Sequence, residues 1–302
     1  MIFLNNNTRY DKKTSVALGI FDGVHLGHRA ILKLAKKYSS DDTAFGVFTF
    51  KSSSVEKKHG EDYSYIYTDR QKEELLESLG TEVIFTPKIR ELMDMSGKDF
   101  AGYILKEKFN AAYVICGERF RFGKGAGCGA DELEEFGRIY GFEVKRCPTV
   151  LDGSGKISSA AIKEHLKSGE IPYANKLLGK KYFIESTVKE GNRIGRTISF
   201  PTANQLFEKR QVIPAIGCYA SVCTVDGKKF PAVTNIGVKP TVEKNIMPLA
   251  ETHILGFEGD IYGKMIKTEL SAFIRAERKF SSLEALKQQI KKDVLSAEKL
   301  LK

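Results

Sequence analysis

The sequence predicts an α/β domain with a doubly wound parallel sheet, followed by an antiparallel β-barrel and a C-terminal helix. Three observations support this division of the 302 residues. Apolar strand-like runs alternate with amphipathic helical stretches through the first half. After residue 179 the chain shows strand patterns separated by Gly, Pro and Asp turns, with no helix between them. The last twenty residues return to helical spacing of apolar side chains.

In the first half, a predicted helix lies between each strand and the next. Strands are predicted at 15–21, 44–50, 82–87, 111–117 and 142–150, with helices near 28–38, 69–79, 98–108 and 130–140. This alternation is typical of a parallel sheet covered by helices on both faces. In such a sheet, ligands bind in a crevice at the carboxyl ends of the strands.

In the second half, strands are predicted at 182–189, 217–225, 229–236, 250–256 and 264–274, and a final helix at 281–301. Such a series of strands predicts an antiparallel barrel with a helix packed against it. A short connecting helix at 171–178 places the division between domains 1–178 and 179–302.

Composition narrows the class of protein. With 42% hydrophobic and 28% charged residues, no signal-peptide core and no apolar run near the roughly 18 residues of a membrane span, we expect a cytoplasmic protein without a membrane partner. The five cysteines are odd in number and form no Cys-x-x-Cys pair, which disfavours a disulfide framework and a zinc module. We expect the cysteines to be reduced thiols. We also expect the protein to be a monomer or a weak homo-oligomer.

The net charge of +10 is concentrated in the second half. Residues 151–302 carry 25 Lys and Arg against 16 Asp and Glu, whereas residues 1–150 carry 23 against 22. A basic surface suits nucleic acid, an anionic membrane or phosphorylated small molecules. Because no nucleic-acid motif with interleaved aromatic residues occurs, a nucleic-acid partner is not expected.

The most informative segment is Gly19-Ile-Phe-Asp-Gly-Val-His-Leu-Gly-His28, between the first strand and the first helix. His25 and His28 are three residues apart at the start of the helix, so they share a face beside free backbone N–H groups, where phosphate binds well. Two imidazoles there can hold a triphosphate and stabilise charge at the α-phosphorus. The alternatives are a structural histidine pair or a zinc site, but no cysteine or carboxylate stands at ligand spacing.

Neighbouring residues complete this expected phosphate site. Gly23 and Gly27 allow close approach of the backbone to a ligand, and Asp22 can cap the turn. Ser158 and Ser159 follow the fifth strand and open a helix that carries Lys163. The predicted phosphate-binding residues in this half are Gly19, Phe21, Asp22, Gly23, Gly27, Ser158, Ser159 and Lys163.

The second constellation is Gly191-Asn-Arg-Ile-Gly-Arg-Thr-Ile-Ser-Phe-Pro-Thr-Ala-Asn204. Its glycines and arginines would form a flexible cationic loop that closes over phosphates. The predicted phosphate-binding residues here are Gly191, Arg193, Gly195, Arg196 and Pro201. After Pro201, Thr202 and Asn204 alternate onto one face and offer the oxygen ligands that suit Mg²⁺. Glu251 lies in a strand pattern and can deprotonate a substrate hydroxyl if it faces the barrel mouth; the alternatives are a solvated Glu and a capping Asn.

These motifs resemble those of one family. Residues 19–28 resemble the His-x-Gly-His signature of the adenylyltransferase superfamily, in the Phe-Asp-Gly-Val-His form of prokaryotic bifunctional riboflavin kinase/FMN adenylyltransferases. In the second half, Gly195–Asn204 resembles the Mg-ATP motif of the riboflavin kinase domain. Residues 235–241, 262–263 and 273–280 resemble further segments of that domain. The resemblance covers nearly the whole chain.

The resemblance implies a bifunctional enzyme that uses ATP and Mg²⁺. The barrel would phosphorylate riboflavin to FMN, with Thr202 and Asn204 on Mg²⁺ and ATP and Glu251 as the base. The first domain would adenylylate FMN to FAD, with His25 and His28 at the α-phosphate. Flavin contacts are implied for Phe120, Phe122, Arg275 and Phe280.

The chain departs from the family pattern mainly in its first half. Lys-Ser-Ser-Ser follows Thr49-Phe50 where the family has Pro-His-Pro, and Arg119 stands where Asp or Asn is usual. Ala160 and Lys163 replace a Thr and an Arg. Two alternatives therefore remain: a riboflavin kinase whose first domain is inactive or altered, and a non-enzymatic flavin or nucleotide sensor that binds RNA.

Overall fold

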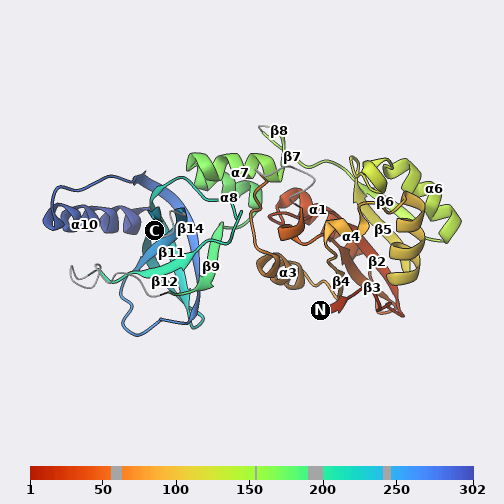
Figure 1. The fold of residues 1–302 in the computed structure, drawn as a ribbon, viewed down its shortest axis with the longest axis horizontal. Coiled ribbons are helices and arrows are strands. Elements are labelled where there is room, and N and C mark those ends of the chain that lie inside the picture. Colours follow the sequence, from red (N-terminus) through yellow and green to blue (C-terminus); the bar gives the residue numbers. More distant parts are fainter. Residues whose placement is uncertain (56–62, 154, 190–199, 241–245) are drawn as a thin grey trace. The chain divides into compact units, whose positions relative to one another are not determined.

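The computed structural model describes residues 1–55, 63–153, 155–189, 200–240 and 246–302. The chain divides into two compact units, Met1–Ser159 and Ala160–Lys302 (Figure 1). Each unit has its own sheet and its own hydrophobic core.

The first unit is built on a six-stranded parallel sheet in the order β1-β4-β3-β2-β5-β6. The strands are β1 (Ile2–Leu4), β2 (Lys13–Leu18), β3 (Thr43–Phe48), β4 (Val83–Phe85), β5 (Ala111–Gly117) and β6 (Glu143–Cys147). The predicted parallel α/β sheet is confirmed. The edge strand β1 was not predicted, because three apolar residues are too few to show a period; it forms only by pairing with β4.

Helices cover both faces of this sheet, as the sequence predicted. Side chains of β2 alternate: Val16 and Leu18 pack under the π-helical segment η2 (Phe100–Lys108) and α6 (Ala130–Tyr140), whereas Ala17 packs under α1 (Leu26–Lys37) and α3 (Asp69–Ser78). Shorter elements complete the unit: 3₁₀ turns η1 (Ser52–Ser54) and η3 (Lys124–Ala126), helices α4 (Ile89–Leu92) and α5 (Gly97–Asp99), and the hairpin β7 (Leu151–Asp152) and β8 (Gly155–Lys156).

The strand order reverses at β2. The chain leaves β2 for β3 on one side, whereas β5 pairs with the other side of β2. Parallel sheets form their ligand crevice at such a switch point, beyond the carboxyl ends of the strands. The turn that contains His25 begins at the carboxyl end of β2.

The second unit is an antiparallel sheet in the order β10-β13-β12-β11-β14-β9. Its strands are β9 (Phe183–Thr187), β10 (Ala203–Leu206), β11 (Gly217–Val225), β12 (Lys228–Pro240), β13 (Ile246–Ile254) and β14 (Met265–Ala276). The two outer strands approach one another: Gln205 Nε2 on β10 donates to the carbonyl oxygen of Ile184 on β9 at 3.4 Å, and Lys189 N donates to Asn204 O at 2.9 Å. These bonds nearly close the sheet into the predicted barrel.

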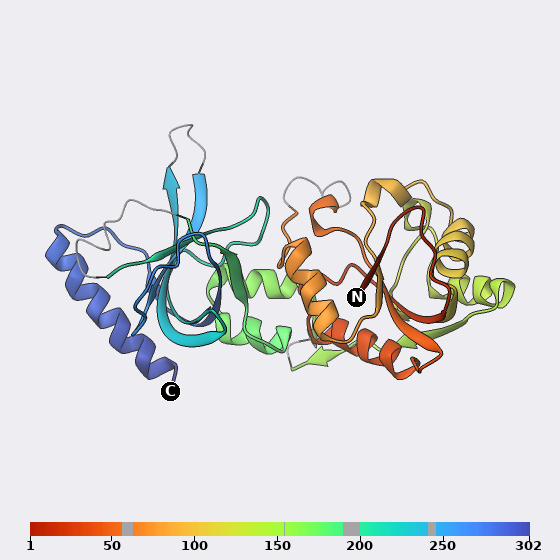
Figure 2. The same cartoon turned by 90° about the horizontal axis from the view of Figure 1, so that it is seen from below.

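Three helices belong with the barrel strands: α7 (Ser159–Ser168), α8 (Ile171–Leu178) and the C-terminal α10 (Leu283–Leu300), which runs beside the barrel (Figures 1 and 2). Asn175 of α8 ties that helix to the barrel, because Nδ2 donates to Leu270 O at 2.9 Å and Oδ1 accepts from Tyr182 N at 2.6 Å. The compact units therefore meet at 159/160, whereas the sequence-based division at 178/179 assigned both connecting helices to the first domain.

All five cysteines are unpaired thiols. Cys218 and Cys223 belong to different hydrophobic clusters of β11. Among the described residues, no helix combines the length and the apolar character needed to cross a bilayer.

Candidate functional site

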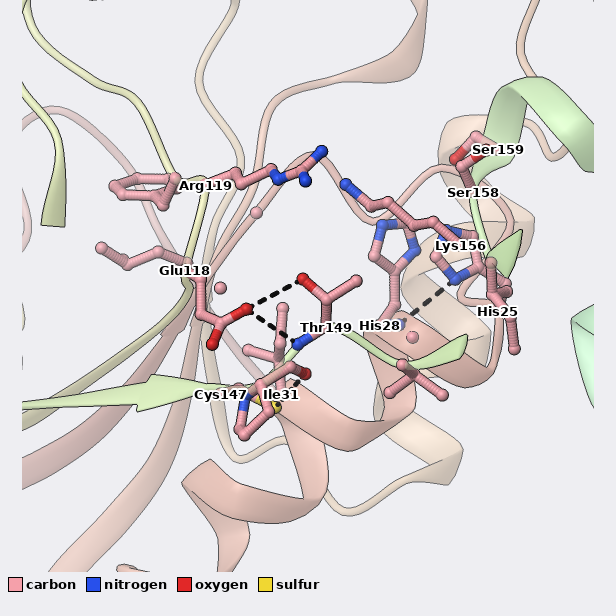
Figure 3. Close-up of a pocket in the computed structure, with 18 residues that line it drawn as sticks. His25, His28, Ile31, Glu118, Arg119, Cys147, Thr149, Lys156, Ser158 and Ser159 are labelled. Atoms are coloured by element: carbon pink, nitrogen blue, oxygen red, sulfur yellow. Dashed lines mark hydrogen bonds between the residues drawn. The ribbon is translucent and has the colours of Figure 1, made fainter. Parts of the chain in front are cut away.

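A pocket of about 310 Å³ lies at the carboxyl ends of β2, β5 and β6 in the first unit (Figure 3). Its lining comes from four segments: the end of β2 with the start of α1, the residues after β5, the residues after β6, and those that lead into α7. Of the predicted phosphate-binding residues, Gly19, His25, Gly27, His28, Ser158 and Ser159 line it.

The two histidines lie against one another at the N-terminus of α1. His25 is the N-cap residue, and its Nδ1 accepts a hydrogen bond from His28 N at 3.3 Å. The two rings stack with centroids 3.6 Å apart and 18° between their planes. A side chain at Gly27 would begin 3.1 Å from the ring of His25, so glycine there leaves room for the stacked pair.

Burial keeps both imidazoles neutral near pH 7. It lowers the pKa of His25 to about 4, with the Lys156 ammonium acting in the same direction. Burial also lowers the pKa of His28 well below its usual value, followed by the effects of His25, Lys72 and Lys156. His28 Nδ1 is buried without a hydrogen-bond partner. The pair can therefore act through ring hydrogen bonds, but contributes no net positive charge.

Three further predicted phosphate-binding residues make contacts within the turn, and a ligand contact by them stays a prediction. Phe21, Asp22 and Gly23 are absent from the pocket lining, as far as the described residues show. Phe21 is fully buried, and its ring packs edge-to-face with that of His28, with the ring centroids 5.3 Å apart. Gly23 has a φ of 84°. The buried Asp22 accepts from Ile66 N through Oδ1 at 2.7 Å, and its carbonyl accepts from Ser159 Oγ at 2.8 Å. These contacts fix the path of the turn around the histidines.

The opposite wall carries charged and polar residues, most of them missed from the sequence. The Glu118 carboxylate accepts from Thr149 N at 3.1 Å and from Thr149 Oγ1 at 3.0 Å. Arg119 belongs to this wall, whereas Lys156 lies beside the histidines (Figure 3); both side chains are exposed. Sequence reasoning missed Thr149, which follows β6, and Lys156, which ends β8.

The two phenylalanines predicted to contact flavin have different surroundings. Phe120 lines the pocket. Phe122 is 7% exposed and packs against Phe100 and Phe136 in the core, with its ring 5.6 Å behind that of Phe120. Phe122 therefore supports Phe120 from the core side.

Lys163 belongs to the second compact unit and is not among the residues that line the pocket.

In the barrel unit, the register aligns the predicted kinase residues. Asn204 on β10 stands directly opposite Glu251 on β13, and Glu251 stands directly opposite Asn235 on β12. Directly opposed residues of an antiparallel pair place their side chains on the same face. Asn204, Glu251 and Asn235 therefore form one row across three strands.

His253 contacts the residues directly before β10. Its Nδ1 lies 2.9 Å from the carbonyl oxygen of Pro201, and its ring meets that of Phe200 edge-on at 5.2 Å. These contacts position the half-buried Thr202 directly before the strand that carries Asn204. Asn204 is 6% exposed, and its Oδ1 is buried without a hydrogen-bond partner.

The two residues predicted near the flavin of the barrel contact one another. Arg275 donates through Nε and Nη2 to the buried carboxylate of Asp293 on α10, with the shortest distance 2.7 Å. Its guanidinium also lies over the ring of Phe280, 5.7 Å from the centroid. Arg275 thus links β14 to the C-terminal helix.

Four predicted loop residues lie outside the described residues: Gly191, Arg193, Gly195 and Arg196.

Family models match both parts of the chain in this order. An FAD synthetase model matches residues 7–161, and a riboflavin kinase model matches residues 178–301. Together they span the pocket with the histidine pair and the row of Asn204, Glu251 and Asn235.

Similar proteins cover nearly the full length. The chain is 36% identical to a bifunctional riboflavin kinase/FMN adenylyltransferase of Bacillus subtilis over 93% of this chain and 90% of that protein. It is 34% identical to the protein of the same name from Escherichia coli, over 93% and 91%. A crystal structure titled macrolide-efflux protein, from Streptococcus pneumoniae, matches 98% of both chains with a TM-score of 0.87 and 28% identity. On the domain models and the two curated relatives, the chain belongs to the family of bifunctional riboflavin kinase/FMN adenylyltransferases.

Proposed function

We propose that this chain converts riboflavin to FMN in its barrel unit and FMN to FAD in its first unit. The observation that carries the proposal is that each unit presents the groups its reaction requires. The barrel aligns a carboxylate with amide oxygens, and the parallel sheet places two stacked imidazoles at a helix N-terminus in its switch-point pocket.

In the kinase step, Glu251 takes the proton of the riboflavin 5′-hydroxyl. The freed oxygen attacks the γ-phosphorus of ATP, the bond to the bridging oxygen breaks, and ADP leaves. Catalysis then consists largely of positioning the two substrates and neutralising phosphate charge.

Mg²⁺ fits the residues that precede and begin β10. The buried Asn204 Oδ1 has no hydrogen-bond partner, and such an oxygen is a suitable ligand for a hard cation. Thr202 would supply a second oxygen, and phosphate oxygens and water the others. Bound there, Mg²⁺ would neutralise charge on the phosphates of ATP.

In the adenylylation step, a phosphate oxygen of FMN attacks the α-phosphorus of ATP and pyrophosphate leaves. Neutral His25 and His28 donate ring hydrogen bonds to the oxygens that gain charge, beside the N–H groups of the first turn of α1. Phe120 offers a ring face at the pocket for the flavin. The proposal includes a cytoplasmic location, which suits five unpaired thiols.

Two variants of the full chain test the assignment of each step to its unit. Glu251→Gln should lower FMN formation from riboflavin by roughly a hundredfold or more while FAD formation from supplied FMN continues. His28→Ala should show the opposite pattern. Loss of both products in either variant would contradict the assignment. Unchanged activity in Glu251→Gln would favour another base or a non-enzymatic role.

A further inference from the structure

Two cationic side chains point toward one another across the mouth of the pocket in the first unit (Figure 3). Arg119 follows β5, and Lys156 ends β8. Neither makes a hydrogen bond or an ion pair with any residue that the structure describes. Two cations that converge on one pocket without internal partners are suited to a ligand with high negative charge.

The other described lining residues supply no positive charge. His25 and His28 are neutral near pH 7, and the carboxylate of Glu118 is occupied by Thr149. Among the described lining residues, Arg119 and Lys156 are therefore the cations available to an anionic ligand.

Lys156 also lies beside the histidine pair (Figure 3), and its charge disfavours protonation of both rings. A phosphate group that contacts the imidazoles therefore comes within reach of the Lys156 ammonium. The guanidinium of Arg119 approaches the same space from the opposite wall and presents a planar fork of donors. The arrangement fits a chain of phosphates better than a single one.

We propose that Arg119 and Lys156 form a cationic clamp that holds the triphosphate of ATP above the His25–His28 pair and neutralises the pyrophosphate that departs. The clamp rests on the proposed adenylylation of FMN. It gives Arg119 a positioning function, and it places at the pocket mouth the charge that the neutral histidines lack.

The test uses Arg119→Met and Lys156→Met in the full chain, singly and together. Each should raise the KM for ATP in FAD formation by roughly ten- to a hundredfold, with a smaller effect on the KM for FMN. FMN formation from riboflavin in the same chain uses the other ATP site and should keep its KM for ATP. Lys124→Met is the matched control: Lys124 is exposed near Arg119 in sequence and pairs with Asp94 at 3.5 Å.

Salt provides a readout that a merely structural role would not change. The wild-type KM for ATP should rise with ionic strength more steeply than that of the double variant, since exposed charges are screened. A KM for ATP within twofold of wild type in the double variant would overturn the clamp. So would a rise confined to the KM for FMN, which would assign the cations to the flavin phosphate.

The clamp and the proposed adenylylation can fail separately. If wild-type protein forms no FAD, the adenylylation proposal fails, and calorimetric titration with pyrophosphate still tests the clamp. Weaker pyrophosphate binding to the double variant would support it, and equal binding would overturn it. If wild-type protein forms FAD and the variants keep their KM for ATP, only the clamp fails.

Discussion

The charge state of the two histidines at the start of α1 follows from their surroundings. His25 is only 4% exposed, and both imidazoles experience burial together with the charge of Lys156. Among the residues that the structure describes, no carboxylate pairs with either ring, so protonation would bring an uncompensated positive charge into the site. The pair is therefore a neutral hydrogen-bonding group near pH 7.

This neutrality predicts a loss of stability in mild acid. The unfolded chain binds protons on these histidines below a pKa of about 6.5, whereas folded His25 resists protonation until about pH 4. The free energy of unfolding should therefore fall as the pH falls through this window, by about 2 kcal/mol from His25 alone between pH 7 and 5. Chemical denaturation at both pH values measures it. His25→Gln should lose that part of the slope; equal slopes in both proteins would contradict this account.

The buried oxygen of Asn204 predicts the cation requirement of the kinase step. Asn204→Leu removes an oxygen whose position fits a Mg²⁺ ligand, so the Mg²⁺ concentration for half-maximal FMN formation should rise roughly tenfold. Asn204→Asp keeps an oxygen and should remain closer to wild type. FAD formation from supplied FMN serves as the internal control. An unchanged Mg²⁺ dependence in Asn204→Leu would assign the metal to other residues.

Local sequence was sufficient to find some site residues and insufficient for others. His25, Gly27 and His28 lie within one turn, so their spacing alone predicted their proximity. Thr149 and Lys156 join the pocket only because β6 and the β7–β8 hairpin end beside it. No local pattern carries that information. The contact of Asp22 with Ile66 N was likewise not predictable, because Ile66 is far along the chain.

The C-terminal helix α10 contacts the barrel through the buried carboxylate of Asp293, here called the polar anchor, as well as through an apolar face. Asp293 is 2% exposed and accepts from Arg275, and Gln289 Nε2 adds a further hydrogen bond at 2.7 Å. Around it, Ala297 packs with Cys218 and Val233 on the barrel strands. The anchor links the C-terminal helix to β14.

Asp293→Ala should destabilise the barrel unit by about 3 kcal/mol, because it leaves the Arg275 guanidinium without its carboxylate. Denaturant unfolding measures the change. A double-mutant cycle with Arg275→Met isolates the pair, and the double variant should lose less than the sum of the single variants. Additive losses would show that the pair contributes no coupling.

A flavin contact by Arg275 stays a prediction, to be tested by the KM for riboflavin in Arg275→Met.

Long elements with a clear period could be predicted from the sequence. A short strand that forms only through pairing, and the unit to which a helix belongs, could not. The helices at 69–78 and 130–140 begin and end within about a residue of expectation, because each has a full amphipathic pattern and a capping residue or glycine. β10 was expected only as extended chain, since its four residues become a strand through pairing with β13. The place of α7 and α8 depends on contacts with the barrel, such as Asn175 to Leu270, which periodicity does not encode.

For the whole molecule, two units with separate cores carry two sites whose proposed reactions share one intermediate. The pocket with His25 and His28 is lined by residues of the first unit, and the row of Asn204, Glu251 and Asn235 belongs to the second. FMN is the product of one proposed step and the substrate of the other. The two activities should therefore be separable by substitution and visible together in a single incubation.

The most direct test is to incubate purified wild-type protein with riboflavin, ATP and Mg²⁺, resolve FMN and FAD by chromatography, and repeat the reaction with FMN supplied. The account predicts FMN followed by FAD in the first reaction and FAD in the second. FMN without FAD in either reaction would contradict the assignment of adenylylation to the first unit. Absence of both products would contradict the enzyme assignment itself.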